Sequence, residues 1–153
     1  MTVRSSAGTT ISLSAGIPAT FNTAGYTALT WTAIGEVTDL GEFGREFNLI
    51  THNPIGSRGT VKLKGSFNEG SITMQMGLDT DDAGQILAKA ASLSDKDYSF
   101  KIITQNGDDY YFQAKVMSFK VNVGSVDSVT SATIMLELTT NSAGVGIIED
   151  LAA

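Results

Sequence analysis

The chain has 153 residues, a length typical of one domain, and 42% of them are hydrophobic while 17% are charged, which argues against intrinsic disorder. A net charge of −6 disfavours a role in gripping nucleic-acid phosphates, because that role needs clustered lysine and arginine side chains. The absence of cysteine excludes disulfide bonds, thiol nucleophiles and thiolate metal sites.

We expect a soluble chain with one domain over residues 1–153. No apolar run approaches the roughly 18 residues of a membrane span. The stretch behind Arg4 is mostly polar and lacks the apolar core of a secretory signal.

Alternation of apolar and polar residues, the period of a β-strand, dominates the chain. In chain order, residues 29–39 and 46–51 are expected to form strands. The alternation at residues 61–67 resumes at residues 72–78 after Asn68-Glu69-Gly70, which predicts a β-hairpin.

A helical period follows. Apolar residues recur there at three- and four-residue spacing: Ala83, Ile86, Leu87, Ala90 and Ala91. We expect one amphipathic helix at about residues 81–92, with Ile86 and Leu87 packed on the sheet.

A second hairpin comes next in the chain. Alternating residues 98–102 lead into Asn106-Gly107, a pair that suits the positive φ of a tight turn, and the return strand begins at Tyr110. The apolar phase of that strand jumps at Val116-Met117, which predicts a β-bulge. With a last strand at residues 132–138, the predicted fold is mainly β: an antiparallel β-sandwich or barrel with one flanking α-helix.

No catalytic, cofactor or metal site is predicted. His52 is the only histidine, and an exposed or interface position is favoured over a general base. The segment from Asp79 to Gly84 resembles the start of an EF-hand loop, but Ala83 and Ala90 stand where ligands are needed. Its aspartates, at positions 79, 81 and 82, are therefore expected to cap the helix.

Two further groups of residues have a possible chemical role. Asp108 and Asp109 are adjacent on a strand, so they point to opposite faces and cannot flank one glycosidic bond. Trp31 and Tyr110 could form a sugar platform, although packing in the core or an interface is commoner for such strand residues. Phe43 is expected either in the core or as an exposed anchor, and the same holds for Phe47.

Charge is segregated along the sequence. Between residues 45 and 64 there is one acid, Glu46, against four bases: Arg45, Arg58, Lys62 and Lys64. Residues 79–109 hold seven acids and three lysines, and residues 121–153 hold four acids and no base. A basic part and an acidic remainder favour head-to-tail association into rings or filaments. The alternative is that folding scatters these charges into no pattern.

The chain resembles the tail tube proteins of long-tailed, non-contractile bacteriophages over about residues 17–140. No single segment is a chemical motif, so the resemblance lies in the order and spacing of several segments. These are Thr20–Tyr26, Trp31–Asp39, Gly41–Glu46, Thr51–Pro54, Arg58–Lys62, Gly65–Phe67, Asp79–Ala91 and the Asn106-Gly107 turn. Residues 1–15 and 141–153 lie outside it and are predicted to be extended arms or tails.

The resemblance implies a β-sandwich subunit that forms hexameric rings, which stack into the tube through which genome DNA leaves the capsid. Implied partners are the subunit itself, a tape-measure protein, a tail terminator and distal tail or baseplate proteins. The resemblance further implies a virion protein made in the bacterial cytoplasm, with no enzymatic activity, no cofactor and no membrane contact.

Two candidate sites follow within this framework. A glycine-bearing loop in the basic stretch is predicted to contact the neighbouring ring; its residues are His52, Asn53, Pro54, Ile55, Gly56, Ser57 and Arg58. Residues 121–139 carry no lysine or arginine, so Asp127 and Glu137 are predicted to face the lumen, where carboxylates would let DNA pass without sticking.

Two rival functions stay open from the sequence. One is a monomeric β-sandwich binding module that recognises sugar or protein through its loops. The other is a hydrolase that uses paired Asp or Glu side chains.

Overall fold

A computed structural model describes residues 3–152. Its strands in this part of the chain are β1 (Thr10–Ser14), β2 (Thr32–Ala33), β3 (Val37–Asp39), β4 (Glu46–His52), β5 (Val61–Asn68), β6 (Ser71–Gly77), β7 (Tyr98–Ile103), β8 (Asp109–Asn122), β9 (Ser131–Thr139) and β10 (Ile148–Asp150). Two helices accompany them, α1 (Thr23–Thr27) and α2 (Ala83–Ser92).

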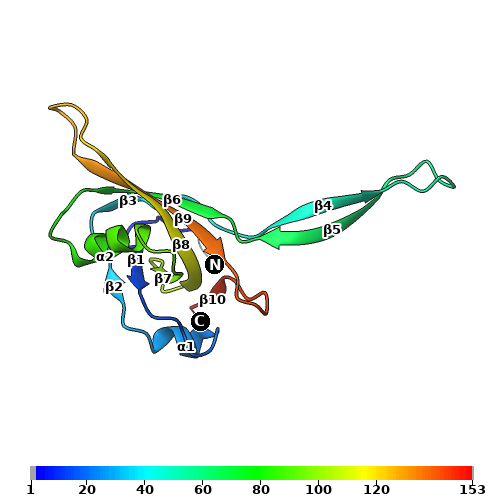
Figure 1. Cartoon of the computed structure of the whole chain (residues 1–153), viewed down its shortest axis with the longest axis horizontal. Coiled ribbons are helices and arrows are strands. Elements are labelled where there is room, and N and C mark those ends of the chain that lie inside the picture. The colour runs from blue at the N-terminus through cyan, green and yellow to red at the C-terminus, as the bar shows by residue number, and fades with distance from the viewer. Residues whose placement is uncertain (1–2, 153) are drawn as a thin grey trace.

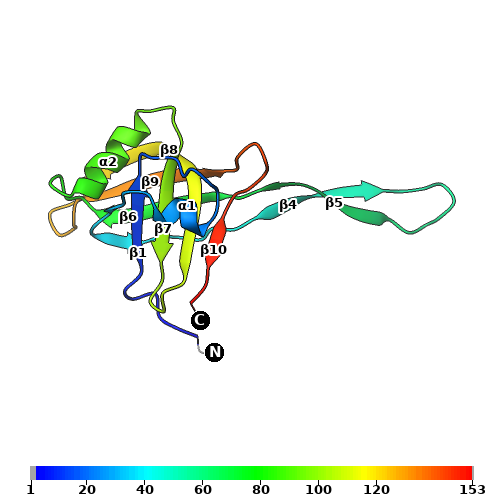
Figure 2. The same ribbon diagram turned by 90° about the horizontal axis from the view of Figure 1, so that it is seen from below.

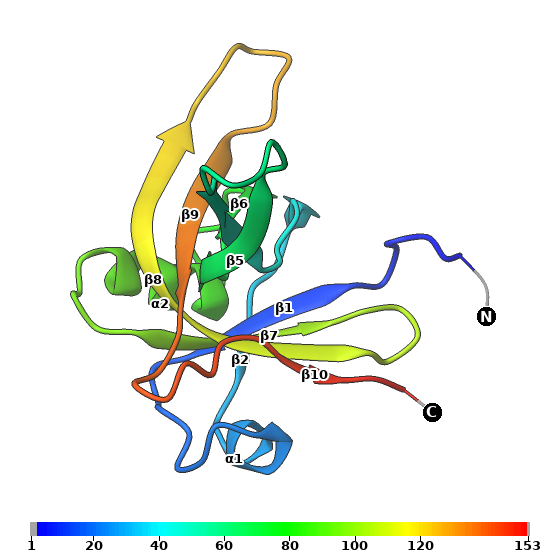
Figure 3. The same ribbon diagram turned by 90° about the vertical axis from the view of Figure 1, so that its right-hand side faces the viewer.

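The body is one curled antiparallel sheet with strand order β2-β1-β7-β8-β9-β6-β3, and β10 pairs with β8 beside this path. Figure 3 shows β8 bending so that its first part runs with β1 and β7 and its second part with β9. The predicted mainly β antiparallel fold with a flanking helix is confirmed. The sheet closes partway on itself as a half-barrel.

The core fills the concave side of the sheet. On β6 and β9 the buried residues pair in register: Met74 lies opposite Ile134, and Ile72 lies opposite Leu136. Phe112 of β8 stacks on Phe100 of β7 with ring centroids 5.5 Å apart. Period-2 alternation therefore reports the buried face of these strands, as predicted from the sequence.

The hairpin of β7 and β8 forms as predicted. Gly107 adopts φ +89°, and the Thr104 N–H donates to the Asp108 carbonyl at 3.0 Å. The register between β8 and β9 shifts between Val116 and Ser118, which confirms the bulge expected there. The last strand, β9, is also confirmed.

The hairpin predicted across Asn68-Glu69-Gly70 is wrong. β5 pairs with β4, with Leu63 opposite Ile50, whereas β6 pairs with β9 and β3. Gly70 takes φ +91° and turns the chain from one strand into a different sheet. Alternation identifies a strand but not its partner, so two consecutive alternating runs looked like one hairpin.

Three other expectations also change. The strand expected over residues 29–39 is divided into β2 and β3 by a turn at Glu36, which has φ +60°. Residues 10–14, expected within an arm, form β1, which pairs with β2 and β7 inside the sheet. Residues 148–150, expected within the C-terminal tail, form β10, which pairs with β8.

Helix α1 was not predicted from the sequence. Its Tyr26 stacks on Tyr111 of β8, with the two ring centroids 5.3 Å apart.

Helix α2 forms where predicted. The side chain of Asp82 caps it by accepting from the Gln85 N–H at 3.0 Å. The inward face differs from the expected one: Ile86 is 55% exposed, while Leu87 packs only partly against the core. The buried positions hold small residues or a glutamine, and at Gly84 the helix lies so close to Ala33 that a Cβ would meet its carbonyl oxygen. No helix in residues 3–152 is long and apolar enough to cross a membrane.

Candidate assembly interface

Strands β4 and β5 form a ribbon that leaves the body at one end of the long axis (Figures 1 and 2). All seven residues of β4 are exposed, and every residue of β5 is exposed or half-exposed. A two-stranded hairpin with no third layer is marginally stable in water. The ribbon therefore presents two unpartnered faces, and this is the feature that most needs a functional explanation.

One face of the ribbon is apolar. Ile50 lies directly opposite Leu63, and Val61 lies opposite His52, so these side chains share a face. The three aliphatic side chains are 47–55% exposed. Gly65 lies beside Ile50, and a Cβ at this position would meet the Ile50 Cδ1 at 3.0 Å. Because glycine has no side chain, this part of the face is flat.

The opposite face is aromatic and basic. Phe47 and Phe67 pair with ring centroids 5.7 Å apart. The Lys64 Nζ lies 4.7 Å from the Phe47 ring centroid, and the Arg45 guanidinium lies 3.8 Å from that of Phe67. These cation–π contacts hold positive charge along this side of the ribbon.

The root of the ribbon is joined by an ion pair. The Arg45 Nε donates to the Glu69 Oε1 at 2.6 Å, and Glu69 is 2% exposed. The Glu69 Oε2 also accepts from the Ile147 N–H at 3.2 Å. One buried carboxylate thus connects the segment entering β4, the segment leaving β5 and the C-terminal segment.

The structure brings the predicted contact loop together at the far tip of the ribbon. Its seven members are His52, Asn53, Pro54, Ile55, Gly56, Ser57 and Arg58, of which all but the half-exposed Pro54 are exposed. The hydroxyl of Thr60 donates to the Asn53 Oδ1 at 2.7 Å and closes the loop. Whether this tip contacts a neighbouring ring stays a prediction.

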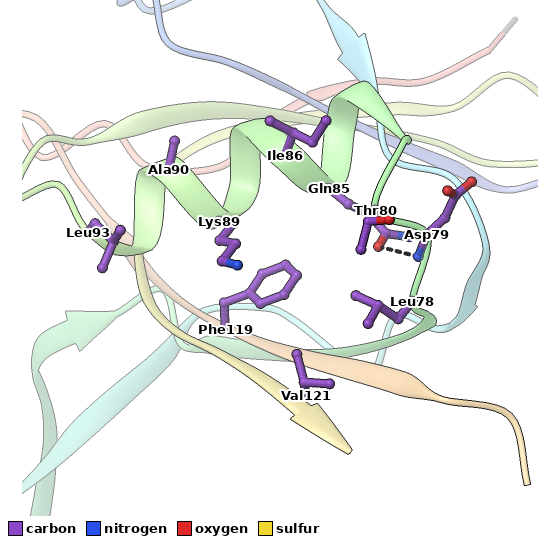
Figure 4. A pocket seen from close by; sticks show the side chains of 10 residues that line it. All are labelled: Leu78, Asp79, Thr80, Gln85, Ile86, Lys89, Ala90, Leu93, Phe119 and Val121. Carbon is purple, nitrogen blue, oxygen red and sulfur yellow. Dashed lines mark hydrogen bonds between the residues drawn. The ribbon is translucent and has the colours of Figure 1, made fainter. Parts of the chain in front are cut away.

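A second group of exposed apolar residues lies at the opposite end of the molecule (Figure 1). A groove of about 460 Å³ runs between α2 and the second half of β8. Figure 4 shows Phe119 and Val121 pointing from β8 toward the helix. Leu93 closes the groove at the helix C-terminus and is 86% exposed. We call this feature the α2–β8 groove.

The two predicted lumen acids are not brought together. Asp127 lies in the exposed loop between β8 and β9, whereas Glu137 is an exposed residue within β9. Glu137 pairs with Ser71 on β6 and with Lys115 on β8, on the face away from the core. That face is rich in hydroxyl and amide groups: Ser71, Thr73, Gln75, Ser118 and Thr133.

The same outer face also carries lysines from β8. Lys115 neighbours Glu137 and forms an ion pair with Asp97, and Lys120 pairs with Thr133. The predicted face is therefore polar rather than purely acidic. Residues 121–139 contain no lysine, but β8 pairs with β9 and brings Lys115 and Lys120 to the same face.

The remaining candidates contact other parts of the chain. Asp108 accepts from the Ala152 N–H at 2.8 Å and from the Asn106 amide at 2.9 Å; these hydrogen bonds lower the pKa of its carboxyl group. Tyr110 packs on Phe43, whereas Trp31 packs on Tyr111. Adjacent strand residues face opposite ways, so Trp31 and Tyr110 do not share a platform.

Phe43 and Phe47 were each expected either in the core or as an exposed anchor, and they occupy different environments. Phe43 packs against the core, and Phe47 lies on the ribbon with 40% exposure. Within residues 3–152, no three His, Asp or Glu side chains are grouped so that they could hold a metal ion.

No model of a known protein family matches the sequence, and no curated protein matches it as a relative. Among solved structures, the chain is similar to a chain in the six-fold symmetrised baseplate of the anti-feeding prophage. The TM-score is 0.66 at 10% identity, over 92% of this chain and 94% of that one.

Two further structures have related folds. A chain in the extended-state sheath/tube terminator of PVC, an extracellular contractile injection system, has a TM-score of 0.66 at 10% identity over 99% of each chain. A chain of the activated phage p2 baseplate has a TM-score of 0.51 at 15% identity, over 86% of this chain and 44% of that one. The chain therefore has a fold found in phage and injection-system tails. Because contractile systems are among the neighbours, the fold does not single out non-contractile tails.

Proposed function

We propose that the chain is the tail tube subunit of a long-tailed, non-contractile bacteriophage and assembles with copies of itself into stacked hexameric rings. The fold shared with baseplate and tube-terminator structures supports a place in a phage-type tail. The resemblance of the sequence over about residues 17–140 supports the non-contractile class and the tube itself.

The observation that carries this proposal is the unpartnered ribbon. Exposed Ile50, Val61 and Leu63 lie on a two-stranded element that contacts no third layer of its own chain. Apolar surface of this kind on a projecting element marks an interaction site. An assembly in which each copy covers the ribbon of another removes that surface from water.

The arrangement of charge supports a head-to-tail contact. The ribbon and its tip carry Arg58, Lys62 and Lys64 against one acid, whereas residues 79–97, on α2 and its flanks, carry five aspartates against two lysines. Unlike surfaces at opposite ends of one molecule favour head-to-tail contacts between copies. They generate repeating assemblies, which close into rings or extend into tubes.

The outer face of β6, β9 and β8 is the proposed lumen wall. Hydroxyl and amide groups dominate it, with Glu137 beside Lys115, so it offers DNA no cluster of free cations. Asp127, on its exposed loop, is proposed to add negative charge at the wall. DNA would pass without specific binding, and no chemical step is assigned to the protein.

The proposed partners follow from this role. They are further copies of the subunit, a tape-measure protein inside the tube, a tail terminator, and distal tail or baseplate proteins. The protein would be made in the bacterial cytoplasm and reside in the virion tail.

Shortening the ribbon tip tests the role of the contact loop. Deleting residues 53–57 removes the tip but no core residue, so we expect a folded chain that no longer forms tubes. Circular dichroism and thermal melting check folding, and negative-stain microscopy checks assembly. Normal tubes from the shortened chain would show that the tip is not the stacking element. If wild-type protein stays as small discrete particles at every concentration, the monomeric binding module becomes the better account.

A further inference from the structure

We propose that the α2–β8 groove of one copy receives the apolar face of the β4–β5 ribbon of a second copy. This inference rests on the proposed self-assembly but names the two surfaces that meet. It also assigns a role to the groove, which no part of the proposed function uses.

The groove is lined mainly by apolar side chains, with Asp79, Thr80, Gln85 and Lys89 among them. Its apolar lining comprises Ile86 and Leu93 from the helix, Phe119 and Val121 from β8, and Leu78 at one end, while Lys89 points from the helix toward Phe119 (Figure 4). Ile86, Leu93 and Val121 are each about half exposed or more. Leaving such side chains in water costs free energy that a covering element would recover.

The ribbon fits this groove in size and character. Helix α2 has ten residues and so measures about 15 Å. Val61 and Leu63 are separated by one two-residue step of about 7 Å, with Ile50 beside them. The three aliphatic side chains therefore lie within the length of the helix, and Gly65 keeps the neighbouring surface flat.

Charge selects the ribbon as the occupant. Five aspartates and two lysines, Lys89 and Lys96, lie on α2 and its flanks between residues 79 and 97. Residues 46–68 of the ribbon carry three bases and one acid, Glu46. Lys62 and Lys64 lie on the ribbon face opposite Val61 and Leu63, so they attract the acidic surround of the groove from behind the docked face, whereas that surround would repel another copy of itself.

The ribbon and the groove of one chain lie too far apart to meet, so the two surfaces must come from different copies. The ribbon projects from one end of the long axis, and α2, which lines the groove, lies on the side of the body away from it (Figure 1). A few aliphatic side chains on each partner bury far less than the roughly 1,000 Å² expected of a stable interface. One such contact is weak, and repetition around a ring strengthens it by multivalency. Covalent trapping is therefore the right test.

The absence of cysteine from the chain makes disulfide trapping clean. One variant carries Leu63→Cys on the apolar face of the ribbon, and another carries Leu93→Cys in the groove. The control partner carries Ile17→Cys, an exposed aliphatic position outside the groove with 63% exposure. Each variant is first checked for wild-type melting, which is expected because all three side chains are more than half exposed.

Mixed under mild oxidation, the Leu63→Cys and Leu93→Cys variants should give several-fold more covalent dimer than the Leu63→Cys and Ile17→Cys variants. An excess of the wild-type chain, which has no cysteine, should reduce that yield, whereas an excess of a chain carrying both Leu63→Asp and Leu93→Asp should not. Equal yields in the two mixtures, or a dominant Leu63–Leu63 product, would overturn the inference.

Microscopy of the same samples separates the two proposals. Tubes without selective trapping would leave the tail-tube role standing and remove the groove as its receptor. Selective trapping without rings or tubes would keep the contact between copies and remove the tail-tube role.

Discussion

Arg45 and Glu69 form an ion pair at the root of the ribbon, with 2.6 Å between the Arg45 Nε and the Glu69 Oε1. Glu69 is almost fully buried, whereas Arg45 keeps part of its side chain in water and lies over the Phe67 ring. Breaking such a pair leaves a buried carboxylate without its main partner, which costs more than the pair itself contributes. The pair thus joins the segment before β4 to the segment after β5 at the root of the ribbon.

The first prediction concerns this pair. Arg45→Ala should lower the free energy of unfolding by about 1–3 kcal/mol, below the full cost of an unpaired buried charge because water can reach the arginine. Arg58→Ala, at the exposed tip, should change it by less than about 0.5 kcal/mol. Urea unfolding of both variants measures the difference. Equal stability of the two would show that the pair does not hold the root.

The second prediction compares two neighbours in α2. Leu87→Ala should cost about 2 kcal/mol, the low end for leucine truncation, because Leu87 packs only partly against the core. Ile86→Ala should be nearly neutral, since Ile86 is 55% exposed and alanine favours a helix. Thermal melting ranks the two variants, and the reverse order would mean that the helix face is assigned wrongly.

The third prediction concerns Gly84, in the first turn of α2. A Cβ at this position would lie 2.1 Å from the Ala33 carbonyl oxygen, so Gly84→Ala should destabilise the fold by about 2 kcal/mol or more. Helix propensity alone gives the opposite sign, a gain of about 1 kcal/mol. Gly56→Ala, in open space at the tip, is the matched control and should melt like wild type. A more stable Gly84→Ala variant would refute the close approach.

The fourth prediction concerns alkaline pH. Burial, followed by the charge of nearby Asp109, raises the pKa of Tyr111 to about 12 from 10.0. Between these values the folded state keeps a proton that the unfolded state loses, so stability falls as pH rises, by at most about 1.4 kcal/mol per pH unit. Tyr111→Phe should be less stable than wild type at neutral pH, because the variant lacks the hydroxyl that donates to Asp109. The difference in free energy of unfolding between the two chains should shrink above about pH 10. Urea unfolding at several pH values measures this, and a constant gap would contradict it.

The fifth prediction concerns the proposed lumen wall. Replacing Asp127 and Glu137 with lysine should leave rings intact but slow DNA passage, because added cations bind phosphates. Glu137→Gln is the control for lost charge alone, since lysine at that position would also stand beside Lys115. Ejection at wild-type speed from tubes shown to carry both lysines would remove these residues from the lumen.

Local patterns predicted much of the fold. The helix, the Asn106-Gly107 hairpin and the bulge after Val116 are each specified by residues close together in sequence. The partner of β5 was missed because alternation describes one strand at a time, and Gly70 redirects the chain between sheets. The Arg45–Glu69 pair spans 24 positions and leaves no local signal.

The candidate site was found only in part. The basic tip from His52 to Arg58 was recognised from its charge and glycine content, and the structure places it at the end of a projecting ribbon. The apolar face of that ribbon was read as ordinary strand alternation, because sequence cannot tell a buried alternating strand from an exposed one. The α2–β8 groove was missed because its two sides come from segments more than 25 residues apart.

Self-assembly into six-membered rings is the central claim, and negative-stain microscopy of the purified wild-type protein over a range of concentrations tests it most directly. The proposed role predicts rings with six-fold class averages that stack into uniform tubes as concentration rises. Discrete particles of the single 16.1 kDa chain at every concentration would contradict it.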